Sequence, residues 1–284
     1  MTGTTTVEAD AAGRPPGTVA LSVDDLGRRF AGITAVQGVT LCVEAGSRLG
    51  IIGPNGAGKT TLFNMLSGEL KPTSGRIRLF GQDVTTMPSH KRVALGLGRT
   101  YQITRVLRGL TVLENLTVAM HGLSRSKLGL LRSWRSYSGK VAEAEQLGAS
   151  FGLGDRLGAD AEELSHGETR ELEVCLALAL KPAVLLLDEP AAGLSPAERV
   201  DIRALLQSLP KELTLIMIEH DMDVLRGSVN DIVVLHLGEL VTRGTVAEIQ
   251  QNELVRELYL GKHRQIDQSP EAGKAQLRGT GPHV

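Results

Sequence analysis

The chain has 284 residues, of which 42% are hydrophobic and 22% are charged, and this balance is typical of a soluble globular protein. Its formal net charge of −1 and its 3% of aromatic residues give no reason to expect nucleic acid as a partner. No uninterrupted apolar run has the length that a membrane-spanning helix needs.

Both ends of the chain are predicted to be flexible tails. Residues 1–18 and 263–284 are polar and contain several Gly and Pro residues, a composition that is typical of disorder. One folded domain is therefore expected over residues 19–262. The two cysteines, Cys42 and Cys175, lie in apolar runs, which predicts two buried free thiols.

The first part of this domain is predicted to be rich in β-structure. Residues 19–52 alternate β-like runs with turns, and GRIRLFGQDV at residues 75–84 indicates a further hairpin. From about Leu110 to Leu164 the apolar residues follow a helical period. A helical part of the domain is therefore expected at about residues 103–180.

The second part of the domain returns to alternating helices and strands. One helix is expected up to Leu180 and another over Pro196–Ser208. Strands are expected at Ala183–Asp188, Leu213–Ile218 and Ile232–Leu237. This order predicts an α/β fold in which a parallel-sheet nucleotide domain is interrupted by a helical insert.

The sequence GPNGAGKTT at residues 53–61 lies between an apolar strand that ends at Ile52 and an apolar helix. A glycine turn followed by a helix N-terminus directs backbone N–H groups at an anion, and glycines let the backbone approach it closely. An ordinary glycine turn before a helix is the alternative, which this strand–loop–helix context disfavours. The pattern predicts that a nucleoside triphosphate is bound by Gly53, Pro54, Asn55, Gly56, Ala57, Gly58, Lys59, Thr60 and Thr61.

Two side chains of this loop have individual roles in that prediction. The ammonium group of Lys59 is expected to reach the β- and γ-phosphates, and the Thr60 hydroxyl is expected to ligate Mg²⁺. The expected cofactors are therefore ATP and Mg²⁺.

The apolar strand in VLLLDEP, residues 184–190, ends in two carboxylates. In a P-loop fold the first, Asp188, would hold Mg²⁺. The second, Glu189, would lie near the γ-phosphate and accept a proton from the attacking water. An acidic pair that merely caps a strand end is the alternative, and the glycine-rich loop makes the catalytic interpretation the stronger one.

Three further fragments occur in an informative order along the chain. They are RTYQ at residues 99–102, LSHGE at residues 164–168 and IEHD at residues 218–221. With the two motifs above, this order closely resembles that of the nucleotide-binding subunits of ABC transporters, over roughly residues 19–262. The resemblance implies a P-loop ABC ATPase cassette: a RecA-like mixed sheet core with an antiparallel β subdomain and a helical subdomain.

The resemblance also implies roles for single residues. Phe30 matches the aromatic residue that stacks on adenine, and Val36 packs beside it. Gln102 matches the glutamine that senses the γ-phosphate and Mg²⁺ and links to the membrane subunit. His220 matches the histidine that positions water and γ-phosphate, so the expected catalytic residues are Glu189, His220 and Gln102.

LSHGE resembles the LSGGQ signature, which in this family completes the ATP site of the opposite subunit in a head-to-tail dimer. Ser165 has the position of a helix N-cap, and Gly167 permits close approach of a phosphate to the backbone. Two positions depart from the family pattern. Glu168 replaces the usual Gln and adds a negative charge, and Ser195 replaces an aspartate that contacts the other subunit.

Several longer phrases, among them GRTYQITRVLRGLTVLENLTVAMHG and DEPAAGLSP, are most similar to importers of branched-chain (hydrophobic) amino acids. This similarity implies ATP hydrolysis coupled to transport, at the cytoplasmic face of the inner membrane. The implied partners are a second, unlike ABC ATPase subunit, two membrane permeases and, indirectly, a solute-binding protein. Importers of urea or short amides, and exporter or lipid-extraction ATPases, remain as alternatives.

Two other classes fit less well. A soluble ABC ATPase of DNA repair or translation would carry a long heptad insert or a second cassette, and neither occurs here. A P-loop kinase or GTPase would leave LSHGE unexplained, and no N-K-x-D guanine motif is present.

Residues 121–140 hold five cations and no acidic residue, which indicates either a solvated face or a surface for anionic lipid: Arg125, Lys127, Arg132, Arg135 and Lys140.

Overall fold

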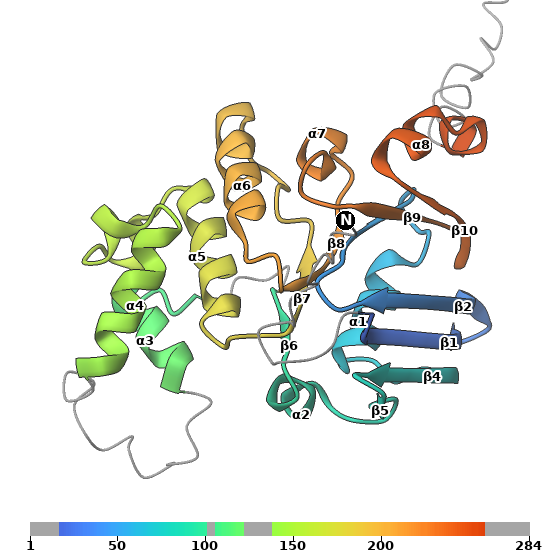
Figure 1. The fold of residues 1–284 in the computed structure, drawn as a ribbon, viewed down its shortest axis with the longest axis horizontal. Coiled ribbons are helices and arrows are strands. Elements are labelled where there is room, and N and C mark those ends of the chain that lie inside the picture. Colours follow the sequence, from blue (N-terminus) through green and yellow to red (C-terminus); the bar gives the residue numbers. More distant parts are fainter. Residues whose placement is uncertain (1–16, 101–105, 122–137, 259–284) are drawn as a thin grey trace, which may run out of the picture.

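The computed structural model describes residues 17–100, 106–121 and 138–258, which form two sheets and the helices around them (Figure 1). One sheet has four strands in the order β2-β1-β4-β5, and the other has six in the order β10-β9-β3-β8-β7-β6. The predicted tail 263–284 lies outside the described residues, as does nearly all of the tail 1–18. Most of the basic stretch 121–140 lies outside them as well.

The four-stranded sheet is antiparallel throughout. It contains β1 (Val19–Phe30), β2 (Ile33–Glu44), β4 (Ser74–Leu79) and β5 (Gln82–Asp83). The pairing of β4 with β5 confirms the hairpin that was predicted from GRIRLFGQDV. Only one face of this sheet packs on the core, because its strands alternate between buried apolar and exposed polar residues.

That alternation corrects the prediction for one of the two cysteines. In β2, Leu41 and Val43 are buried, and Cys42 between them is exposed. Successive side chains of a strand point to opposite faces, so an apolar neighbourhood in the sequence does not bury every residue within it. Cys175 is buried as predicted, and this burial raises the pKa of its thiol to about 12.

The six-stranded sheet forms the centre of the molecule. Five of its strands are parallel: β3 (Arg48–Ile52), β6 (Leu97–Arg99), β7 (Val184–Asp188), β8 (Thr214–Ile218) and β9 (Asp231–His236). The edge strand β10 (Glu239–Gly244) pairs antiparallel with β9, which makes the sheet mixed. The inner strands β7 and β8 are buried along their whole length because both faces of the sheet are covered there.

Strand β7 shows how the two faces are divided. Val184 and Leu186 belong to the core that is shared with the four-stranded sheet, and Leu185 and Leu187 belong to the core on the opposite face. The first core contains helix α1 (Lys59–Ser67). The second is covered by α6 (Pro196–Ser208), α7 (Met222–Leu225) and α8 (Val246–Gln251). The bounds of α6 are those predicted from the sequence.

The helical part of the domain lies beside the edge of the sheet that ends in β6 (Figure 1). It contains α3 (Val112–His121), α4 (Ser138–Ser150), α5 (His166–Leu178) and two short 3-10 helices, η3 (Gly154–Arg156) and η4 (Ala161–Glu163). A third hydrophobic cluster joins α3, α4 and α5, and α5 also packs against α6. A short helix, α2 (Ser89–Ala94), precedes β6.

None of the helices in the described part of the chain is long and apolar enough to span a membrane.

Candidate nucleotide-binding site

The predicted phosphate-binding and catalytic residues meet at one edge of the six-stranded sheet. Strands β3, β8 and β7 are parallel neighbours, and their register places Ile51 opposite Ile218 and Ile218 opposite Asp188. The segments that follow these strands therefore leave the sheet at the same level. The glycine-rich loop follows β3, Glu189 follows β7, and His220 comes shortly after β8.

The glycine-rich loop closes onto the start of α1. Gly58 has a left-handed backbone (φ +98°) and begins the helix, and no side chain of the described residues caps α1 there. The amides of its first turn are thus available to an anion. The Lys59 ammonium group is buried and donates to the carbonyls of Gly53 (2.6 Å) and Pro54 (3.1 Å), which holds it across the loop.

The structure gives a second reason for two of the loop glycines. A Cβ atom at Gly53 would overlap the Leu235 carbonyl oxygen, and one at Gly58 would overlap the Ala35 carbonyl oxygen. A Cβ atom at Gly56 would meet nothing within 4 Å. Close packing of the loop on β2 and β9 therefore requires glycine at positions 53 and 58, even without a bound phosphate.

The remaining loop residues lie on its solvent side. Asn55, Gly56 and Thr60 are exposed, Pro54 and Thr61 are half-buried, and Ala57 is buried. The Ala57 carbonyl accepts a hydrogen bond from Gly238 N–H (3.0 Å), so the turn after β9 supports the loop from below.

The Asp188 carboxylate is nearly inaccessible, with 1% of its side chain exposed. Its Oδ2 atom lies 3.2 Å from a terminal nitrogen of Arg99, and its buried Oδ1 atom has no hydrogen-bond partner among the described residues. Burial raises the pKa of Asp188, and the Arg99 guanidinium acts against that rise. An unsatisfied carboxylate oxygen at the sheet edge from which the glycine-rich loop leaves fits a hard cation such as Mg²⁺.

Glu189 has a backbone conformation that is unusual for its residue type. Its φ angle is +49°, and the turn is fixed by Glu189 N–H donating to Ile218 O (2.9 Å) and by Ala192 N–H donating to Glu189 O (3.0 Å). A non-glycine residue in the left-handed region is strained, and such strain is concentrated at functional sites. The side chain is half-buried at the edge of the sheet, so solvent or a ligand can reach it there.

Glu219 is a candidate site residue that the sequence analysis missed. It is fully buried (0% exposed), and its Oε1 atom accepts from the backbone N–H groups of His220 (2.8 Å) and Asp221 (3.2 Å). Its Oε2 atom accepts from Ala191 N–H (3.2 Å) in the turn after Glu189. The available signal was an acidic residue directly after a buried strand, inside the quoted fragment IEHD.

The His220 side chain is 63% exposed, and its Nδ1 atom lies 3.4 Å from Glu219 Oε1. The imidazole is therefore oriented by a buried carboxylate while its other side remains open to a ligand. The predicted partner in γ-phosphate sensing, Gln102, lies outside the described residues.

The two residues predicted at the adenine differ in exposure. Phe30 is 40% exposed at the tip of the β1–β2 hairpin, and the Arg28 guanidinium lies 4.5 Å from the centre of its ring. An exposed aromatic ring leaves a face for a base to stack on. Val36 is fully buried (0% exposed) beneath the glycine-rich loop, where it supports Gly58.

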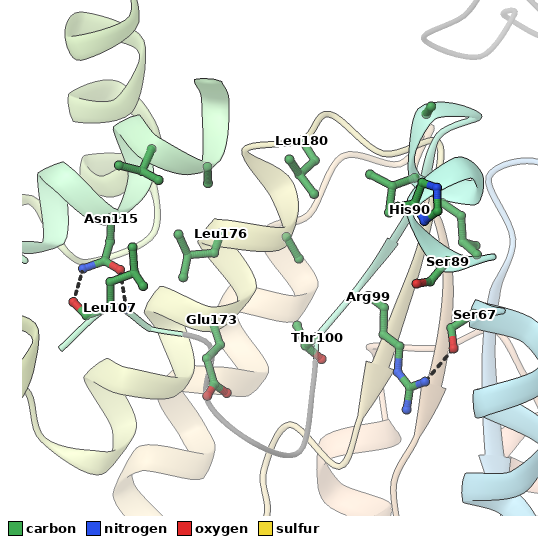
Figure 2. Close-up of a pocket in the computed structure, with 16 residues that line it drawn as sticks. Ser67, Ser89, His90, Arg99, Thr100, Leu107, Asn115, Glu173, Leu176 and Leu180 are labelled. Carbon is green, nitrogen blue, oxygen red and sulfur yellow. Dashed lines mark hydrogen bonds between the residues drawn. The ribbon is translucent and has the colours of Figure 1, made fainter. Parts of the chain in front are cut away.

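A groove of about 640 Å³ separates α2 and β6 from α3 and α5 (Figure 2). Its wall includes the exposed apolar residues Leu107 and Val118, and the Glu173 carboxylate, which is 8% exposed, comes from α5. Glu173 accepts from Arg170 (2.7 Å) through one oxygen, and the other has no hydrogen-bond partner among the described residues. Arg99 and Thr100 form the opposite wall.

The family model described as "ABC transporter" matches residues 36–192. The chain is 39% identical to the high-affinity branched-chain amino acid transport ATP-binding protein BraF of Pseudomonas aeruginosa, over 85% of this chain and 98% of that protein. It is 38% identical to LivG of Escherichia coli, which has the same description, over 85% of this chain and 98% of that protein. The chain belongs to the ABC transporter family.

Solved structures of ABC transporter cassettes agree with this assignment. An ATP-binding cassette in its ADP conformation has a TM-score of 0.75 and 28% identity, over 86% of this chain and 99% of that one. A bacterial ABC transporter cassette in a dimeric structure has a TM-score of 0.69 at 22% identity, over 80% of this chain and 98% of that one, which shows the shared fold. The resemblance to ABC transporter subunits and the cassette fold that it implied are both confirmed.

The signature segment of this ABC cassette forms a capping box at the start of α5. The Ser165 hydroxyl accepts from Glu168 N–H (3.1 Å), and Glu168 Oε2 accepts from Ser165 N–H (2.8 Å). Arg156 lies 3.0 Å from the other Glu168 oxygen. The negative charge that Glu168 adds is thus paired with Arg156 and with the Ser165 N–H group of the same chain.

Gly167 ties the signature to the following helix. Its backbone N–H donates to Glu198 Oε1 (2.9 Å) in the first turn of α6. These side-chain contacts of the signature all lead to neighbouring residues of the helical part or to α6, and none of them leads to the glycine-rich loop.

Ser195, the other departure from the family pattern, is the N-cap of α6. Its hydroxyl accepts from Glu198 N–H (3.4 Å), and Glu198 Oε2 accepts from Ser195 N–H (2.8 Å). We expect Ser195→Ala to lower the free energy of unfolding by about 1 kcal/mol, because an N–H group of the first turn loses its partner. Ser195→Asp keeps a capping oxygen and is expected to stay within about 0.5 kcal/mol of the wild type.

Urea denaturation of the two Ser195 variants beside the wild type measures this difference. Equal losses of stability in Ser195→Ala and Ser195→Asp would contradict the capping role.

Proposed function

We propose that this chain is the ATP-binding and ATP-hydrolysing subunit of an ABC importer for branched-chain or other hydrophobic amino acids. The observation that carries the proposal is identity of 38–39% over almost the full length of two proteins described as branched-chain amino acid transport ATP-binding proteins. The sheet edge described above supports hydrolysis, because it gathers an anion cradle, a buried carboxylate and a strained glutamate.

The proposed reaction is attack of water on the γ-phosphate of ATP, giving ADP and phosphate. The first turn of α1 and the Lys59 ammonium group bind the phosphates, and Phe30 stacks on the adenine. Thr60 and Asp188 would hold Mg²⁺, which neutralises charge on the phosphate oxygens when it is bound. Glu189 accepts the proton of the attacking water, and His220 positions that water.

We propose that the working unit contains a second, unlike ABC ATPase subunit. The hydrogen bonds of Ser165 and Gly167 lead to Glu168 and Glu198 and not to the glycine-rich loop, which supports completion of each ATP site by the other subunit. The two departures, Glu168 and Ser195, make this chain's contribution atypical. An unlike partner allows the two composite sites to differ.

The groove of Figure 2 is the proposed contact for a membrane permease. Leu107 and Val118 are 49% and 46% exposed at its wall, and such apolar patches mark interaction surfaces. The groove adjoins Arg99 and Thr100, which directly precede the segment that contains Gln102. Two permeases, bound in this way by the two ATPase subunits, would place the chain peripherally on the cytoplasmic face of the membrane.

The test is reconstitution with the unlike ATPase, both permeases and the solute-binding protein in lipid vesicles. We expect substrate-loaded binding protein to stimulate ATP hydrolysis and uptake of labelled leucine, and the isolated chain to hydrolyse ATP slowly and without regard to leucine. Urea serves as the matched control solute. Uptake of urea in place of leucine would redirect the proposal to the short-amide importers, and transport-coupled hydrolysis by the isolated chain would contradict the heterodimer.

A further inference from the structure

Arg99, at the end of β6, is a buried cation that the mechanism above does not use. Its side chain is 7% exposed, and one terminal nitrogen lies 3.2 Å from Asp188 Oδ2. The other terminal nitrogen donates to the Ser67 hydroxyl (2.7 Å) and lies 3.2 Å from Glu69 Oε2. Figure 2 shows the guanidinium reaching from β6 to the end of α1.

The contact with Asp188 makes the two oxygens of its carboxylate different. Oδ2 is engaged by Arg99, whereas Oδ1 is buried and has no hydrogen-bond partner among the described residues. A hydrogen bond to one oxygen restrains the rotation of a buried carboxylate and so orients its other oxygen. Asp188 therefore presents Oδ1 in a defined orientation.

The contacts with Ser67 and Glu69 fix the guanidinium from the other side. Ser67 is the last residue of α1 and Glu69 follows shortly after it, and the N-terminal end of that helix carries Lys59 and Thr60. Arg99 thus connects β7, which supplies one proposed metal ligand, with α1, which supplies the other. A planar guanidinium with several donors suits such a three-way contact, and a lysine ammonium suits it less well.

We propose that Arg99 is a positioning residue for the metal site: it holds Asp188 Oδ2 and α1 together so that Asp188 Oδ1 and the Thr60 hydroxyl are pre-arranged for the magnesium ion of a bound nucleotide. This inference rests on the proposed function. Hydrogen-bond partners of metal-ligating carboxylates orient the ligand, and their removal typically lowers metal affinity 10- to 100-fold.

Two effects of Arg99 on a cation oppose one another. Its positive charge repels the cation, and its hydrogen bonds orient the ligand. Asp188 is nearly inaccessible, so without Arg99 its charge would be buried with less compensation and the side chain would be free to turn toward other donors. In this proposal the orienting effect is larger than the repulsion. Removal of Arg99 should then weaken metal binding, whereas it would tighten metal binding if repulsion were the larger effect.

The experiment uses the full chain with ADP and Mn²⁺, whose binding is followed by electron paramagnetic resonance, and repeats the titration with Mg²⁺ as competitor. Arg99→Met is expected to weaken Mn²⁺ binding in the ADP complex by roughly 10- to 100-fold. The affinity for ADP in EDTA is expected to change less than threefold. Arg99→Lys, which keeps the charge but loses the three-way contact, is expected to fall between Arg99→Met and the wild type.

Arg243→Met is the matched control, because Arg243 also makes an ion pair (Asp231, 2.5 Å) but lies on β10, away from the metal site. It should leave Mn²⁺ binding unchanged. In an Asp188→Asn background, Arg99→Met should cause little further loss, since the group that Arg99 positions is already altered. That background also relieves the uncompensated charge if Arg99→Met alone folds poorly.

Three results would overturn the inference: unchanged Mn²⁺ affinity in Arg99→Met with only a lower melting temperature, tighter Mn²⁺ binding in that variant, or fully additive losses in the double variant. Failure of the proposed function is separate, because the wild type itself would then show no binding of Mn²⁺ that depends on ADP.

Discussion

The variant Glu189→Gln is expected to bind ATP with wild-type affinity and to hydrolyse it roughly 100- to 10,000-fold more slowly, which is the usual contribution of a general base. The amide has the shape of the carboxylate and must adopt the same backbone conformation at φ +49°, so the turn after β7 should be retained. Only the capacity to accept a proton is lost. Binding, which does not need that proton transfer, should persist.

The retained γ-phosphate should also stabilise the ATP-bound head-to-tail dimer that this subunit is proposed to form with the second ATPase subunit. In Glu189→Gln a negative charge that faces the phosphate is removed, so repulsion within the ATP-bound state falls. ATP affinity, the rate of steady-state ATP hydrolysis and the elution of the dimer in size-exclusion chromatography should be measured for Glu189→Gln and the wild type side by side. Glu239→Gln, at an exposed position that begins β10, is the control for the same chemical change.

Near-normal hydrolysis by Glu189→Gln would show that the general base is a group other than Glu189. His220 would be the next candidate, because its exposed imidazole follows the neighbouring strand β8.

The variant Gly58→Ala is expected to bind ATP roughly 10- to 100-fold more weakly than the wild type. Its Cβ atom would overlap the Ala35 carbonyl oxygen, and its φ angle of +98° is unfavourable for alanine. The loop must shift to relieve the overlap, which moves the first amides of α1 away from the phosphates. The loss of one hydrogen bond to a charged group costs about 1.5–3 kcal/mol, and this sets the expected range.

Gly81→Ala is the matched control, because Gly81 in the β4–β5 turn has a similar φ of +78° and a Cβ atom added there would meet nothing within 4 Å. It carries the backbone strain without the overlap. Both variants should be compared by titration with ATP and by thermal unfolding. If Gly58→Ala lost stability but kept full ATP affinity, ATP binding would not depend on this close packing.

The sequence predicted the central sheet well because its signals are local. Buried parallel strands read as apolar runs of about five residues, and VLLLDEP and TLIMIEHD show such runs directly. Their predicted limits, Ala183–Asp188 and Leu213–Ile218, differ from β7 and β8 by one residue at the start. The motif residues at the ends of these strands were placed by the same reasoning, because parallel strands share one carboxyl edge.

The supporting residues could not be predicted, because their partners are distant in the sequence. Arg99 and Asp188 are 89 positions apart, and Gly167 and Glu198 are 31 positions apart. No periodicity or spacing connects such pairs, and each becomes visible only once the register of β6 on β7 and the packing of α5 on α6 are known. Tertiary contacts of this kind decide how a motif is held, whereas local pattern decides where it lies.

The carboxylate of Glu219 has a dynamic consequence. It accepts hydrogen bonds from Ala191 in the turn after β7 and from His220 and Asp221 in the turn after β8. Glu219 itself lies in the turn after β8, so the bond from Ala191 is the one of these three that joins the two turns, and a bond to a charged group is worth about 1.5–3 kcal/mol. The turn that bears Glu189 and the turn that bears His220 are therefore coupled through this bond, and a fluctuation that opens one turn away from the other must break it.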